Sequence, residues 1–180
     1  MQEAHVTNRV LLLTRSDGFG KQLRERLLAS SVLRRRWPIV DEALRAHKQR
    51  NYVLSIPPLL AQVEGIIADA LILKNLVKPK GKKLLARQAD GSLKRGKDGD
   101  AVELRGIGSL VTHSDFQSDL ALKDTASFLT TQLVGNRNAI LHGRDTSYGR
   151  AKLSAQILLV LLVLVSEVDA FEHGRVRLRE

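Results

Sequence analysis

The stretch 51-NYVLSIPPLLAQVEGIIADALILKNLV-77 points most directly to the fold class. Its apolar residues recur every three or four positions, the period of one helix face: Leu59, Leu60, Val63, Ile66, Ile67, Ala70, Leu71 and Leu73. Ser55 is placed to cap the start of a helix, and Pro57 and Pro58 suit a first turn. We therefore predict a long core helix in which Glu64 is a lone acid within the apolar stripe.

Similar patterns flank this helix on both sides. Helical patterns run from Phe19 to Leu33, from near Pro38 to about Lys48, from Asp115 to about Val134, and from roughly Tyr148 to Phe171. Gly135-Asn136 can end the third of these helices, and Thr146 or Ser147 can cap the last. Residues 1–15 lack such a pattern and are expected to form a tail or an edge segment.

Residues 78–106 differ in composition from the rest of the chain. They contain nine Lys and Arg against four Asp and Glu, with several glycines. Asp90-Gly91 is a hairpin-turn signal, so we expect a mobile loop or a small β-hairpin inserted between helices. The segment either forms a solvent-exposed surface loop or binds a polyanion. The candidate RNA-binding residues are Lys80, Lys82, Lys83, Arg87, Lys94, Arg95 and, further along the chain, Arg144.

These patterns together predict an all-α bundle of four or five helices with one basic insertion. Residues 1–33 would form an N-terminal tail or helix, and residues 34–180 a helical domain. The longest apolar run, Ile157 to Val165, is much shorter than the roughly 20 residues of a membrane span. We read it as a buried helix of a soluble protein and expect no membrane partner.

The amino-acid composition limits the kinds of site that the chain can form. The 180-residue chain has no cysteine, which excludes disulfides and thiolate metal sites and suits the reducing cytosol. No two histidines show the short spacing of a zinc site, so we expect no metal and no cofactor. The formal net charge of +10 favours a nucleic-acid or other anionic partner, although a merely soluble basic protein would also show it.

A polar cluster precedes the last predicted helix, in 135-GNRNAILHGRDTSYG-149. Arg137 and His142 are five positions apart, about 140° around a helix axis, so they converge only if a turn intervenes or a second subunit supplies another copy. An Arg offers a fixed fork of donors to a phosphate, and a His can exchange a proton with an RNA 2′-hydroxyl near neutral pH. The alternative is that Arg137 and His142 only brace the start of the last helix.

The segment 137-RNAILH-142, followed by Gly143 and a charged turn, resembles the Arg-polar-x-x-x-His signature of the HEPN superfamily. It looks most like C-terminal HEPN domains of phage- and defence-associated bacterial proteins, in which a similar block follows a helix like 52-YVLSIPPLLAQVEGI-66. The resemblance spans roughly residues 34–172. It implies a small helical bundle, usually a homodimer with the two motifs facing each other across the interface.

Active members of this superfamily are metal-independent endoribonucleases that leave 2′,3′-cyclic phosphate ends, with roles as toxins or in antiviral defence. By the resemblance, Arg137 would stabilise the phosphate, Asn138 would be the polar helper, and His142 the acid and base. Many other members are inactive and bind RNA, nucleotide or a partner protein such as an antitoxin, which remains the alternative.

The supporting residues are Glu64, Gly143, Asp145 and Tyr148. Glu64 would bond the motif arginine or nearby backbone, or lie partly exposed. Asp145 would pair with Arg144 or cap a helix, and Tyr148 would pack with its hydroxyl at the surface.

Overall fold

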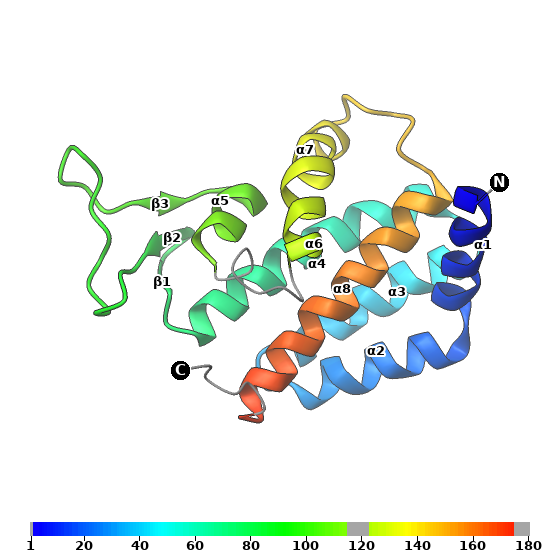
Figure 1. Ribbon diagram of the computed structural model, residues 1–180, viewed down its shortest axis with the longest axis horizontal. Helices are drawn as coiled ribbons and strands as arrows, with labels where there is room; N and C mark the ends of the chain where they lie inside the picture. Colours follow the sequence, from blue (N-terminus) through cyan, green and yellow to red (C-terminus); the bar gives the residue numbers. More distant parts are fainter. Residues whose placement is uncertain (1, 115–122, 175–180) are drawn as a thin grey trace. The chain divides into compact units, whose positions relative to one another are not determined.

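The computed structural model describes residues 2–114 and 123–174, which fold into two compact units (Figure 1). We call Met1–Ile66 with Ile140–Glu180 the helical unit, and Ile67–Ala139 the sheet unit. Helices dominate the described residues, beside a small three-stranded antiparallel sheet. The predicted helical class is therefore confirmed, but the described residues form eight α-helices instead of four or five, and the basic insertion forms the sheet.

The helical unit is built from five α-helices and one 3-10 turn among its described residues. They are α1 (Gln2–Arg15), α2 (Asp17–Ala29), η1 (Arg34–Arg36), α3 (Trp37–Lys48), the first part of α4 (Tyr52–Leu73) and α8 (Ala151–Glu172). Figure 1 shows α8 beside α1 and α2, and these helices contact one another directly.

The first helix was not expected, because residues 1–15 were predicted to be a tail or an edge segment. Its apolar residues do not mark a buried stripe: Leu12 and Leu13 are 71% and 52% exposed. Thr14, a polar residue, is fully buried. A hydrophobic pattern therefore could not reveal α1, which contacts α2 and α8.

Helices α2 and α3 follow their sequence patterns closely. Ser16 caps α2, because its side chain accepts a hydrogen bond from the backbone N–H of Phe19, and α2 ends at Ala29 instead of Leu33. Helix α3 carries Pro38 in its first turn, as predicted, since a proline there loses no helical hydrogen bond.

Helix α4 begins earlier than its sequence signals suggest. Ser55 does not cap it, because this residue lies inside the helix and is fully buried, and its backbone N–H donates to the carbonyl of Asn51. Pro57 and Pro58 consequently lie within the helix and not in its first turn. A proline at such a position removes a donor from the helical ladder, so a carbonyl one turn earlier needs another partner.

The last helix, α8, begins at Ala151, three residues after the predicted start, and ends at Glu172, one residue after the predicted end; its centre is buried, as expected. Its N-cap is Arg150, which makes no side-chain cap hydrogen bond, so the expected cap at Thr146 or Ser147 is wrong. By length and composition alone, α4 and α8 are each apolar enough to cross a membrane, with 56% and 50% of the apolar windows buried inside the fold. Core helices of soluble proteins also meet that criterion.

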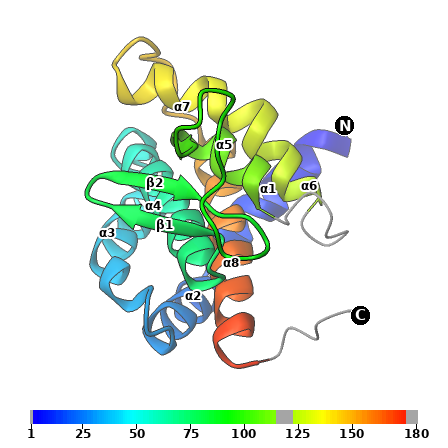
Figure 2. The same cartoon turned by 90° about the vertical axis from the view of Figure 1, so that its left-hand side faces the viewer.

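The sheet unit contains three strands, β1 (Val77–Lys80), β2 (Lys83–Ala86) and β3 (Glu103–Leu104), in the order β1-β2-β3. Figure 2 shows β1 and β2 side by side. Its helices are α5 (Gly106–His113), α6 (Lys123–Ser127), the π-helical η3 (Phe128–Leu133) and α7 (Val134–Leu141), of which the last two residues belong to the helical unit. The predicted turn at Asp90-Gly91 is present: Gly91 has a φ of +81°, and the N–H of Ser92 donates to the Asp90 carboxylate.

Two helical predictions in this unit need correction. Helix α5 was not expected. The chain also stays helical through Gly135 and Asn136 into α7, although this pair was predicted to end a helix. The first part of the helix expected from Asp115 lies outside the described residues.

Candidate functional site

The Arg-Asn pair of the predicted motif lies on α7. The Arg137 guanidinium donates a hydrogen bond to the Asn138 side-chain oxygen over 3.0 Å. Arg137 is half-buried, whereas Asn138 is exposed. The predicted helper therefore contacts the arginine, and this contact limits the orientations of the guanidinium fork.

His142 follows directly after α7, which ends at Leu141. Gly143 terminates the helix with a φ of +68°, a conformation that costs glycine nothing, and its N–H donates to the carbonyl of Ile140. His142 is exposed. It belongs to the helical unit, whereas Arg137 and Asn138 belong to the sheet unit, so the three residues are related by their spacing along the chain.

Asp145 closes a turn in the segment between α7 and α8. One of its carboxylate oxygens accepts hydrogen bonds from both the backbone N–H and the hydroxyl of Ser147, at 2.8 and 2.9 Å. This Asx-type turn explains the residue without a catalytic role. The neighbouring Arg144 is exposed, as a nucleic-acid contact requires.

Tyr148 supplies a hydrogen-bond donor that Pro57 cannot supply within α4. Its hydroxyl donates to the carbonyl of Val53 over 3.3 Å, and this is the carbonyl that residue 57 would serve in a regular helix, where Pro57 has no N–H. Gly149 lies against the same residue, since a Cβ there would meet the Val53 side chain at 2.7 Å. Glu64, further along α4, is half-buried.

Removing the Tyr148 hydroxyl is expected to destabilise the fold by about 0.5–1.5 kcal/mol, the net worth of one hydrogen bond. Tyr148→Phe in urea unfolding tests this. Pro57→Ala restores an N–H for the Val53 carbonyl. In a Pro57→Ala background, Tyr148→Phe should therefore lower the free energy of unfolding by less. Equal costs in the two backgrounds would show that the hydroxyl does not substitute for the missing donor.

The predicted RNA-binding residues of the insertion lie in and around the sheet, and they divide into two groups. Arg87 bonds the side chain of Asn75, and Arg95 donates to the backbone carbonyl of Gly99 at 2.8 Å, so both arginines brace the sheet unit itself. Lys80, Lys82, Lys83 and Lys94 are exposed.

Sequence analysis missed a buried polar cluster in the helical unit. The two ring nitrogens of His47 bond the hydroxyls of Thr14 at 3.0 Å and Ser154 at 2.8 Å. Ser154 in turn bonds Ser55 at 3.0 Å. All four side chains are fully buried, so this serine–histidine arrangement is closed to a substrate. Burial, with the nearby charge of Arg15, lowers the pKa of His47 to about 4.

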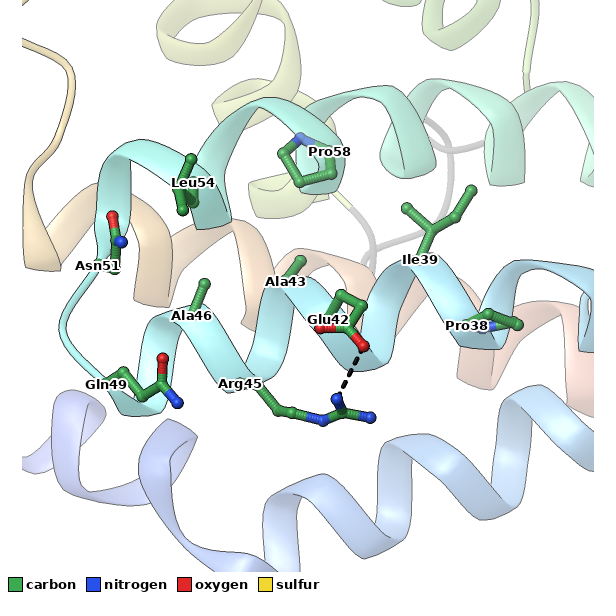
Figure 3. Close-up of a pocket in the computed structure, with 10 residues that line it drawn as sticks. All are labelled: Pro38, Ile39, Glu42, Ala43, Arg45, Ala46, Gln49, Asn51, Leu54 and Pro58. Atoms are coloured by element: carbon green, nitrogen blue, oxygen red, sulfur yellow. Dashed lines mark hydrogen bonds and ion pairs between the residues drawn. The ribbon is translucent and has the colours of Figure 1, made fainter.

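An open groove of about 600 Å³ runs between α3 and the start of α4 in the helical unit (Figure 3). Its floor and walls are mainly apolar, and the side chains of Glu42 and Arg45 lie bonded to each other at its edge. Its lining residues are Pro38, Ile39, Glu42, Ala43, Arg45, Ala46, Gln49, Asn51, Leu54 and Pro58. None of these is a residue of the predicted motif.

Within residues 2–114 and 123–174, no three His, Asp or Glu side chains gather as metal ligands would. No protein-family model matches the chain, and neither a curated protein nor a solved structure matches it.

Proposed function

We propose that this chain is a HEPN-type endoribonuclease that cleaves RNA without a metal ion, as a homodimer with a toxin or antiviral-defence role in the cytoplasm. The single observation that supports it best is the hydrogen bond from Arg137 to Asn138 on α7. This bond orients a permanently charged, half-buried fork of donors five positions before an exposed histidine in the chain. The net charge of +10 suits a polyanionic substrate.

These side chains suffice for 2′-hydroxyl chemistry. His142 would take the proton from the ribose 2′-hydroxyl while the 2′-oxygen attacks the adjacent phosphorus. The bond from phosphorus to the 5′-oxygen breaks, and that oxygen would take the proton that His142 has accepted. Arg137 would stabilise the negative charge that develops on the phosphate oxygens. The products are a 2′,3′-cyclic phosphate and a 5′-hydroxyl, with no ion and no external nucleophile consumed.

The proposal predicts RNA cleavage that persists in EDTA. Purified full-length protein should cut a mixed-sequence RNA in EDTA, and the fragments should carry 2′,3′-cyclic phosphate and 5′-hydroxyl ends. A matched RNA with 2′-O-methyl groups is the control, because it lacks the nucleophile and should stay intact. Cleavage that EDTA abolishes, or fragments with 5′-phosphate ends, would contradict the mechanism.

A second candidate is a non-catalytic HEPN module that binds RNA, nucleotide or a partner protein such as an antitoxin. The exposure of both Asn138 and His142 favours it, since a single chain leaves these side chains open to water. Salt-sensitive RNA binding without cleavage of any RNA would select this candidate.

A further inference from the structure

The pairing of β1 with β2 and β3 gathers basic side chains on one face of the sheet. Residues directly opposite in an antiparallel ladder point to the same face. Lys80 is opposite Lys83, Lys78 is opposite Leu85, and Leu85 is opposite Glu103. Arg105 lies two residues after Glu103, in extended backbone, and so joins the same face. We call Lys78, Lys80, Lys83 and Arg105 the lysine face.

Among the described residues, Glu103 is the acid that contacts this face, and it pairs with two of the four cations. One carboxylate oxygen of Glu103 lies 3.1 Å from the Lys83 ammonium and 3.0 Å from the Arg105 guanidinium. The hydrogen bonds from Arg105 and Lys83 lower the pKa of Glu103, so it stays ionised at neutral pH. Even so, the face keeps a net excess of three positive charges.

The hairpin that carries this face places like charges together. Lys80 and Lys83 are the last pair before the two-residue turn Gly81–Lys82, and like charges directly opposite destabilise a ladder. Gly81 has a φ of +59°, and the adjacent Lys82 adds another exposed charge. A polyanion that spans several of these cations would stabilise this concentration of positive charge.

The composition of this region limits the kinds of polyanion that it could bind. Residues 67–114 contain no Phe, Trp or Tyr, whereas proteins that hold single strands stack bases on aromatic side chains. Contacts from lysine to phosphate carry no sequence information directly. The strands have few exposed apolar side chains on this face, so nothing here would insert into a lipid surface.

We propose that the lysine face binds the phosphate backbone of duplex RNA, independently of sequence. The choice of RNA rests on the proposed function, whereas the preference for a duplex rests on the charges and on the lack of stacking residues. This proposal leaves out two arginines that the sequence predicted to bind RNA. Arg87 and Arg95 form hydrogen bonds within the sheet unit instead.

The test measures fluorescence anisotropy of labelled RNA with full-length His142→Ala protein, so that binding is separated from cleavage. We expect Lys78→Gln/Lys80→Gln to weaken binding of a duplex at least roughly tenfold at 0.1 M salt. The slope of log Kd against log salt should become shallower by about 2, one for each lost phosphate contact. Lys78→Arg/Lys80→Arg should bind as the parent does.

The matched control is Arg9→Gln/Lys21→Gln, which removes two exposed cations from the helical unit; it should change duplex binding little. Equal losses in control and test variants, or unchanged binding in Lys78→Gln/Lys80→Gln, would overturn the proposal. So would tighter binding of a single strand than of the duplex, or binding to phosphatidylserine vesicles without binding to the duplex. Duplex binding by a protein that cleaves no RNA would leave this inference standing and remove only the proposed nuclease.

Discussion

Replacing His142 with alanine is expected to slow RNA cleavage by about 10²- to 10⁴-fold, the usual worth of a positioned general acid or base. The residue is exposed beside the end of α7, so its removal leaves no cavity and should leave the unfolding midpoint unchanged. Single-turnover cleavage of one RNA, compared with urea unfolding of the same preparations, separates lost chemistry from lost structure.

His5→Ala is the matched control, because it removes another exposed histidine, on α1, and should cleave at the parent rate. Arg137→Lys is the companion variant. It keeps a positive charge but loses the fork that bonds Asn138, and combined with His142→Ala it should add little further loss, since residues that act as a unit are not additive. A His142→Ala protein that cleaves as fast as the parent would remove this histidine from the mechanism.

The parts of the fold that the sequence predicted are those governed by local periodicity. Helices α3 and α8, and most of α4, show apolar residues at helical spacing and form as expected. The Asp90-Gly91 turn was also predictable, because a glycine adopts a positive φ without steric cost. In each case the deciding residues lie within a few positions of one another.

The remaining differences depend on contacts made far along the chain. No local signal shows that Pro57 can stand inside α4, because its compensating donor is Tyr148, 91 residues later. The cap expected at Ser55 failed for the same reason, since its hydroxyl bonds Ser154 in the core instead of a helix terminus.

The candidate site shows the same division. Its signature placed Arg137 beside Asn138, and their hydrogen bond is present. Sequence spacing could not tell that α7 continues through both residues. His47 was passed over because it has no histidine neighbour, yet it occupies the apolar stripe of α3 with Val40, Ala43 and Leu44. A histidine at a core position of an amphipathic helix is a signal for a buried polar cluster.

The hydrogen bonds around His47 define its protonation state. The Thr14 hydroxyl donates to the carbonyl of Val10 at 3.0 Å, so it accepts from the ring nitrogen Nε2 of His47. In this tautomer the other ring nitrogen, Nδ1, accepts from the hydroxyl of Ser154, whose oxygen can then accept from Ser55. A proton on Nδ1 would require the buried hydroxyls of Ser154 and Ser55 to reorient. It would also add a positive charge near Arg15, which itself bonds Tyr52.

We therefore expect the protein to lose stability as the pH falls below about 6.5. The pKa of His47 is about 4 in the folded chain, against 6.5 for an unperturbed histidine, so between these values the unfolded chain binds a proton that the folded chain does not. At 1.36 kcal/mol per unit, the free energy of unfolding should fall by about 2 kcal/mol from pH 6.5 to pH 5, and by about 3 kcal/mol at pH 4. Urea unfolding at each pH measures the fall.

His47→Gln is the matched variant, since its amide can donate to Thr14 and accept from Ser154 without titrating. It should flatten the stability profile between pH 7 and pH 5, a range above that in which the carboxylates of Asp17 and Glu103 become protonated. An NMR titration of the parent provides an independent readout, in which the His47 ring signals should stay constant down to about pH 5. A ring that titrates near 6.5, or a variant whose stability depends on pH as strongly as the parent's, would show that this histidine is not held neutral by the core.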